Sequence, residues 1–193
     1  MNARKWPMLF GLLVSLAAVV AGFIAGADRV EDWQLAARWT ARVGFPVFLL
    51  TYAASSLARL WPGPLTRSLG RNRRWWGLGF AASHSVHLVA LVTFLMIVPE
   101  SRTLASLIPG GFGYVVIYAM ALTSSDGAMR ALGRNWKRLH TFGIHTIWLI
   151  FTLAYAGRIG EAATRTEGVI ATALAMSALI LRLAARRRSR VLA

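Results

Sequence analysis

The sequence predicts an all-α membrane protein, a bundle of six transmembrane helices with both termini in the cytoplasm. Three observations support this fold class. Hydrophobic residues make up 56% of the 193 residues and charged residues only 15%, whereas about a quarter of the residues in soluble domains are charged. Several uncharged stretches are long enough to cross the roughly 30 Å hydrocarbon core of a bilayer. Lysines and arginines gather in alternate links between these stretches, as the positive-inside rule describes.

The first apolar stretch covers residues 7–27. A run of about 20 residues can span a bilayer and is long for the apolar region of a signal peptide. We therefore expect a retained helix, although Ala25-Gly26-Ala27 resembles a cleavage site. Residues 28–42 then mix charged side chains with Trp and Leu. This pattern predicts an amphipathic segment that lies at the membrane surface.

The remaining spans are separated by polar links and by proline or glycine. They are predicted at residues 44–60, 75–98, 109–123, 139–156 and 169–183. Pro46 stands near the start of its span, where a missing N–H costs little. Trp61-Pro62-Gly63-Pro64 ends the same span, because prolines and glycines favour turns.

The distribution of charge predicts the orientation. Sixteen of the 22 Lys and Arg residues fall at the two termini and in the second and fourth links, and six of the seven Asp and Glu residues fall on the other side. The positive-inside rule therefore places both termini in the cytoplasm. The net charge of +15 is accounted for by this clustering, so we expect membrane lipid and no nucleic acid as a partner.

Cysteine is absent from the sequence. Disulfides, thiolate redox chemistry, iron–sulfur clusters and cysteine-ligated haem are therefore excluded. The sequence also shows no Ser/His/Asp set, no HExxH motif and no glycine-rich loop of the kind that binds phosphates. We expect no nucleotide-binding domain, and whether the chain is itself an enzyme stays open.

All four histidines lie in two of the predicted spans: His84 and His87 in the third, His140 and His145 in the fifth. Both spans enter from the same side, behind similar basic segments that contain tryptophan. An ionisable group within a span is costly and by default indicates function. A single imidazole could simply hydrogen-bond a neighbouring helix, but four on two parallel spans favour a set of haem ligands.

Depth in the membrane suggests which histidines pair. Counted from the tryptophans that open the two spans, and at a rise of about 1.5 Å per residue, His145 is level with His84 and His87. His140 is about 10 Å shallower than His87 on the same count. The predicted axial pair is therefore His145 with His87 or His84. Whichever of His84 and His87 is not a ligand would lie beside the site. His140 would lie near the propionates, at the entry point of electrons, or would bind a second haem.

The type of haem follows from the same residues. With no CxxCH motif the haem would be non-covalent and b-type, and ligation by two histidines suits electron transfer. Basic side chains at the cytoplasmic end could pair with the propionates, and Arg74 and Arg138 are the leading candidates. The other members of this basic group are Arg71, Arg73 and Lys137. The group is equally explained as an ordinary signal of topology.

Two separated motifs resemble the ferric-reductase-like transmembrane domain family. The first is Arg73-Arg74-x-x-Gly77-Leu78 with His87 ten residues after Gly77. The second is Thr123-Ser124 followed by Leu132-Gly133-x-x-Trp136-x-x-Leu139-His140. The resemblance covers the whole layout of six spans, including the polar surface segment after the first span.

This resemblance implies a six-helix domain that binds b-type haem and carries electrons across the inner membrane. It implies a cytoplasmic flavin reductase or quinone as donor and a periplasmic redox partner, with a molybdenum oxidoreductase as the candidate. His87 and His140 match haem histidines of the family, but Leu153 stands where the family has a further histidine. His84 and His145 are additions that could rebuild a ligand pair; otherwise the chain has lost its haem.

Two other functions fit the same sequence. In one, the protein is free of haem and its histidines relay protons or bind a quinone. In the other, the chain is an assembly or scaffold subunit that keeps the fold only to bind partners.

Overall fold

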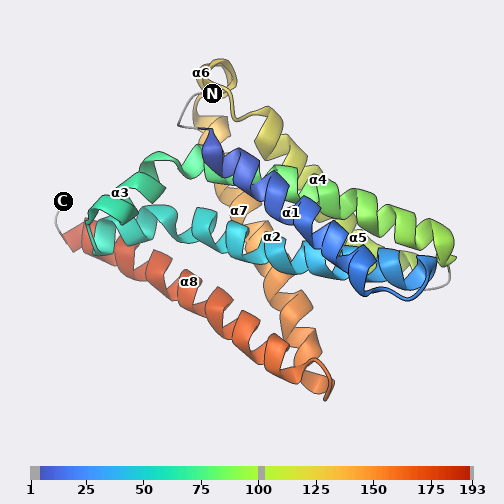
Figure 1. The fold of residues 1–193 in the computed structure, drawn as a ribbon. Helices are drawn as coiled ribbons and strands as arrows, with labels where there is room; N and C mark the ends of the chain where they lie inside the picture. The colour runs from blue at the N-terminus through green and yellow to red at the C-terminus, as the bar shows by residue number, and fades with distance from the viewer. Residues whose placement is uncertain (1–4, 100–102, 192–193) are drawn as a thin grey trace. The chain divides into compact units, whose positions relative to one another are not determined.

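The computed structural model describes residues 5–99 and 103–191, and these residues form helices and no strand (Figure 1). The helices follow the order α1 (Trp6–Ala25), α2 (Arg29–Leu60), α3 (Pro64–Arg71), α4 (Arg73–Ile97), α5 (Leu104–Leu122), α6 (Asp126–Leu132), α7 (Arg134–Ala156), the 3-10 helix η2 (Gly157–Gly160) and α8 (Arg165–Val191).

Six of the described helices are long and apolar enough to cross a membrane: α1, α2, α4, α5, α7 and α8. The predicted all-α class is therefore confirmed for the described residues, and the number of candidate spans agrees with the predicted six. The cytoplasmic location of the two termini stays a prediction, because length and composition do not distinguish the two sides.

The structure differs from the predicted organisation at the second span. The predicted surface segment, residues 28–42, and the predicted span, residues 44–60, form one continuous helix, α2. Pro46 lies inside this helix and does not divide it. The reason is local, because residues 35–45 are mostly good helix formers and contain no pair of turn-forming residues.

The chain forms two compact units, which are described separately here. Met1–Thr51 and Arg74–Gly111 make up the first unit, and Tyr52–Arg73 and Phe112–Ala193 make up the second. The boundaries fall within α2, α4 and α5, so each of these helices contributes residues to both units.

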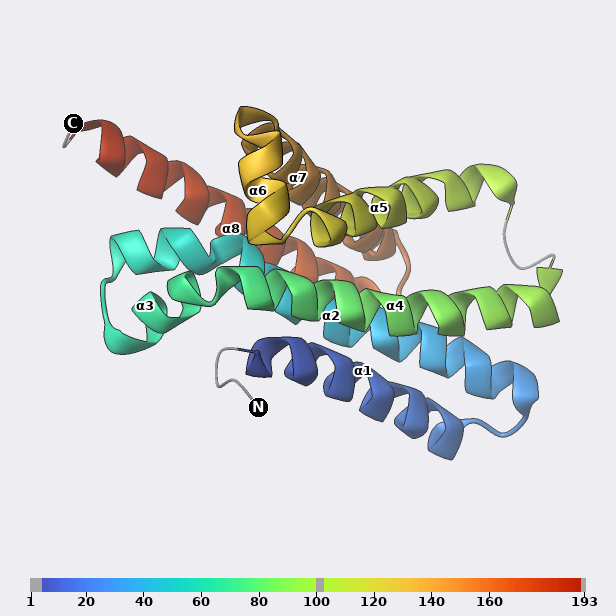
Figure 2. The ribbon, with the colours of Figure 1, turned by 90° about the horizontal axis from the view of Figure 1, so that it is seen from above.

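In the first unit, small residues allow α1 to pack closely on α4 (Figure 2). A Cβ atom on Gly11 would overlap the backbone carbonyl of Gly79, so the two backbones meet directly at this crossing. One turn further along, the hydroxyls of Ser15 and Ser83 form a hydrogen bond of 2.6 Å, and both side chains are fully buried. Close approach through small residues with a polar contact is typical of packed membrane helices.

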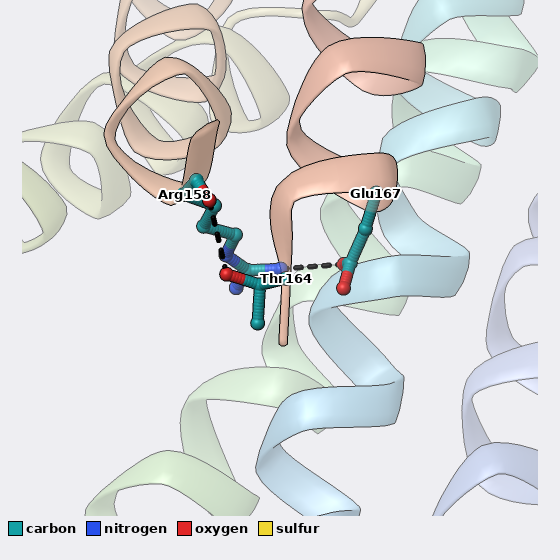
Figure 3. Close-up of polar contacts among 3 residues, drawn as sticks. All are labelled: Arg158, Thr164 and Glu167. Carbon is teal, nitrogen blue, oxygen red and sulfur yellow. Dashed lines mark hydrogen bonds and ion pairs between the residues drawn. The ribbon is translucent and has the colours of Figure 1, made fainter. Parts of the chain in front are cut away.

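In the second unit, a short link joins α7 to α8 and is held by side chains (Figure 3). The guanidinium of Arg158 forms an ion pair with Glu167, and the hydroxyl of Thr164 donates a hydrogen bond of 3.1 Å to the Arg158 carbonyl. Further along, the indole N–H of Trp148 donates to the carbonyl of Ala175 at 2.8 Å. These contacts place α8 against α7.

Candidate functional site

The structure places the histidines two in each unit. His84 and His87 lie on α4 in the first unit, with ring centroids 5.6 Å apart. His140 and His145 lie on α7 in the second unit. The predicted pairing of His145 with His87 joins the two units and stays a prediction.

His87 is held by a threonine of α2. Its Nδ1 lies 3.0 Å from the hydroxyl oxygen of Thr40. The same oxygen lies 2.7 Å from the carbonyl of Ala36, one turn earlier on its own helix. Thr40 is fully buried, and His87 is partly buried.

Small residues bring Thr40 within reach of His87. Ala36 and Ala37, one turn before Thr40, form a buried cluster with Ala90, which lies three residues after His87. With only methyl groups at this crossing, α2 and α4 approach closely enough for a short threonine side chain to reach an imidazole. The local sequence thus positions the polar pair.

His84 is enclosed within the first unit and only 6% of its surface is exposed. Its ring lies 4.2 Å from that of Phe80 between centroids. The opposite wall is the backbone of Gly44, where an added Cβ would overlap the imidazole and lie 2.8 Å from Nδ1. Gly44 was not among the predicted site residues; its only signal in the sequence is a glycine at the start of a predicted span.

His145 is held in the second unit by a tyrosine of α2. Its Nδ1 lies 3.1 Å from the hydroxyl of Tyr52, and the two rings meet edge to face at 5.6 Å. Tyr52 is fully buried and stacks against Trp148 at 6.3 Å with an interplanar angle of 19°. The phenol ring is therefore fixed, and its hydroxyl fixes the imidazole.

A cation lies against the same tyrosine. The guanidinium of Arg182 on α8 is 4.5 Å from the centroid of the Tyr52 ring, and its Nη1 donates to the Tyr52 carbonyl at 2.9 Å. No carboxylate pairs with Arg182 among the described residues, and its buried Nε has no hydrogen-bond partner there. Arg182 falls inside the predicted sixth span, just before the basic C-terminal segment, and a charge within a span indicates function.

His140 is held differently. Its Nε2, not its Nδ1, lies 3.1 Å from the hydroxyl of Thr123. The ring stacks on the indole of Trp136 at 4.2 Å, and the Trp136 N–H donates to the carbonyl of Thr123 at 2.8 Å. The Thr123 hydroxyl lies 2.7 Å from the carbonyl of Ala119.

The two predicted propionate ligands lie near the ends of spans. Arg74 has its guanidinium 5.6 Å from the centroid of the Trp75 ring, and Arg138 is exposed. Their role with propionates stays a prediction. In the described ranges, no three His, Asp or Glu side chains converge on a point that could hold a bare metal ion.

The side chains around His87 and His145 fit a haem ligand. Iron accepts a neutral imidazole nitrogen, and such an imidazole usually engages its other nitrogen with a hydrogen-bond partner that fixes the ring. His87 and His145 both engage Nδ1 in this way, with Thr40 and Tyr52 respectively. This arrangement directs Nε2 away from the partner in each case.

The chain is similar to a known membrane subunit. No protein-family model matches the chain. A protein of Cronobacter sakazakii, the protein-methionine-sulfoxide reductase haem-binding subunit MsrQ, is 32% identical over 143 residues, which cover 66% of this chain and 68% of the relative.

Proposed function

Since this chain belongs to the family of MsrQ haem-binding subunits, we propose that it is a multi-pass membrane protein that binds haem and transfers electrons. The proposal rests on the positions and the hydrogen bonds of the histidines. All four lie in helices that can span a membrane, and His87 and His145 each engage Nδ1 with a hydroxyl of α2. Imidazoles held in this way are typical of metal ligands.

The proposed haem is b-type, because the sequence has no cysteine for covalent attachment. Bound haem would supply one-electron exchange at its iron. His87 and His145 are the proposed axial ligands, Thr40 and Tyr52 would orient their rings, and the apolar helices would exclude water. Arg74 and Arg138, with their positive charge, are the proposed partners of the propionates.

The proposed direction of transfer is from the cytoplasm to the periplasm across the inner membrane. The donor would be a cytoplasmic flavin reductase or quinone, since the chain carries no nucleotide-binding motif of its own. The acceptor would be a periplasmic oxidoreductase, with a molybdenum enzyme as the candidate. The relative is named as a subunit of a protein-methionine-sulfoxide reductase, so oxidised methionine is the proposed final substrate of the partner.

A spectrum of the purified protein tests this function. We expect a b-type band in the reduced-minus-oxidised difference spectrum, and a colourless protein from haem-replete cells would refute the proposal. The measured ratio of haem to protein decides between one haem and two.

Histidine substitutions test the proposed ligands. His145→Ala should abolish retention of a single haem, because an axial nitrogen is lost. If His140→Ala alone removes the haem, the proposed pair is wrong.

A second function is favoured by one specific contact. The hydroxyl of Tyr52, the imidazole of His145 and the cation of Arg182 form a group that could hydrogen-bond a quinone or pass a proton. In this alternative the protein holds no haem. A colourless protein whose proton flux depends on His145 would support it.

A further inference from the structure

Two histidines are held by threonines in the same way but through different ring nitrogens. Thr40 contacts Nδ1 of His87, and Thr123 contacts Nε2 of His140. Each threonine hydroxyl also contacts the carbonyl four residues earlier in the chain. The chain therefore contains two copies of one hydrogen-bonding arrangement.

The distances indicate which group donates in each contact. O–H···O bonds have a usual length of about 2.7–2.8 Å, and N–H···O bonds of about 2.9–3.0 Å. Thr40 lies 2.7 Å from the Ala36 carbonyl and 3.0 Å from the His87 nitrogen. A hydroxyl has a single hydrogen, so Thr40 donates it to Ala36 and accepts a hydrogen from Nδ1 of His87.

In the second pair the hydrogen is on the other ring nitrogen. Thr123 lies 2.7 Å from the Ala119 carbonyl and 3.1 Å from Nε2 of His140. Thr123 therefore donates to Ala119 and accepts from Nε2–H. A neutral imidazole carries one ring hydrogen, so Nε2 of His87 keeps its lone pair, whereas Nε2 of His140 does not.

We propose that Thr40 is a positioning residue, which holds His87 in the Nδ1–H tautomer and so presents Nε2 as the ligand of haem iron. Thr123 holds His140 in the Nε2–H tautomer, which excludes that nitrogen from ligation. The part that concerns iron rests on the proposed function; the assignment of the two tautomers does not.

Burial of Thr40 helps to maintain the Nδ1–H tautomer of His87. Thr40 has no exposed surface, so water cannot replace it as the acceptor for Nδ1–H. His87 also hydrogen-bonds the backbone carbonyl of Ala37, so loss of the Thr40 hydroxyl removes one of two acceptors for its ring N–H. Substitutions of partners that orient metal-binding histidines typically weaken metal affinity about 10–100-fold.

The first experiment reads the tautomers without haem. The protein is labelled with 15N-histidine, prepared as the apo form in detergent, and its ring nitrogens are assigned by single histidine substitutions. We expect Nδ1–H at His87 and Nε2–H at His140. In Thr40→Val the share of the Nδ1–H tautomer at His87 should fall, with the Ala37 carbonyl as the remaining acceptor, and in Thr40→Ser it should be kept. Nε2–H at His87 in the unaltered protein would overturn the inference.

The second experiment titrates the same apo-proteins with haem. Thr40→Val should bind haem about 10–100-fold more weakly and change the low-spin ferric EPR signal, and Thr40→Ser should restore both. Thr123→Val is the matched control and should bind haem as the unaltered protein does. Equal affinity of Thr40→Val and the unaltered protein would refute the role of Thr40.

The two proposals fail in different ways. If the unaltered protein takes up no haem but shows the two expected tautomers, the haem function is refuted and the tautomer assignment is retained. If the protein binds haem and Thr40→Val is without effect while Thr123→Val weakens binding, the haem function stands and the inference is overturned. Thermal unfolding of each variant checks that the substitution leaves the fold intact.

Discussion

Gly44 determines where the His84 ring can lie. The imidazole occupies the space that a side chain at this position would fill, and His84 is almost fully buried there. Neighbouring Ser83 also approaches, with its hydroxyl oxygen 3.3 Å from the position of an added Cβ. A glycine inside a helix weakens that helix, so its presence here is explained by the packing of the imidazole.

We expect Gly44→Ala to destabilise the protein by about 1–3 kcal/mol, because an extra methyl group must displace the His84 ring or separate α2 from α4. Thermal unfolding in detergent measures the effect. Gly111→Ala in α5 is the matched control, since no atom lies within 4 Å of an added Cβ there. The control should stabilise by about 0.5–1 kcal/mol through helix propensity, and an equal response of both variants would contradict the packing argument.

Tyr52→Phe tests the partner of His145. The substitution keeps the ring that contacts Trp148 and Arg182 but removes the hydroxyl that holds Nδ1. If His145 is an axial ligand, haem affinity should fall about 10–100-fold, as measured by titration of the apo-protein. Tyr52→Leu, which also removes the ring, should be less stable. Unchanged affinity in Tyr52→Phe would show that His145 does not depend on this hydroxyl.

At the scale of residues, the sequence could predict the histidines but not the side chains that hold them. A histidine in an apolar span is visible in any window of the sequence. Thr40 and Tyr52 are 47 and 93 residues away from the imidazoles that they contact. No periodicity or motif encodes such separations, because they depend on which helices pack together. The sequence does show Arg182 as a charge inside a predicted span. The basic tail follows it closely, however, so this arginine is easily taken for part of the tail.

At the scale of elements, α2 shows why a continuous helix was predicted as two segments. The charged residues of its first half and the apolar residues of its second half differ in hydropathy, and hydropathy predicts environment. Continuity of the backbone depends instead on helix formers and on the absence of turn residues. The two properties change at different places in the chain, so a boundary in one is not a boundary in the other.

The link between α7 and α8 supports a prediction about stability. The ion pair of Arg158 and Glu167 is about one-third exposed on the arginine side and one-quarter on the glutamate side, 34% and 26%. Partly exposed pairs contribute about 0–1 kcal/mol, so Glu167→Gln should lower stability by no more than that. A double-mutant cycle with Arg158→Gln in thermal unfolding measures the coupling.

Glu161→Gln serves as the control for this pair, because Glu161 is an exposed carboxylate of the same link. It should leave the stability unchanged at low and at high salt. The effect of Glu167→Gln should shrink as salt screens the pair. A larger effect at high salt would contradict an electrostatic origin.

At the scale of the whole molecule, the charge distribution predicts that both termini lie in the cytoplasm. Alkaline phosphatase, which is active only outside the cytoplasm, should be inactive when fused after the C-terminus and active when inserted in the link at residues 160–164. Green fluorescent protein should give the opposite result. Phosphatase activity at the C-terminus would contradict the predicted topology.

The number of spans could be predicted because hydropathy is a local property, and six apolar stretches correspond to six candidate membrane-spanning helices in the described chain. The short helices α3 and α6 were not predicted. They lie in links whose prolines, glycines and charges are typical of turns, and each is held by a local contact, such as the Ser125 hydroxyl that accepts a hydrogen bond from the Ala128 N–H.

Helix α2 provides the contacts for three imidazoles, through Thr40, Gly44 and Tyr52, although it contains no histidine itself. The side chains able to bind a metal and the side chains that orient them are thus encoded by different stretches of the gene. Random mutagenesis confined to codons 29–60 would leave every candidate ligand in place. Variants with an altered redox potential could be selected from such a library without changing the coordinating atoms.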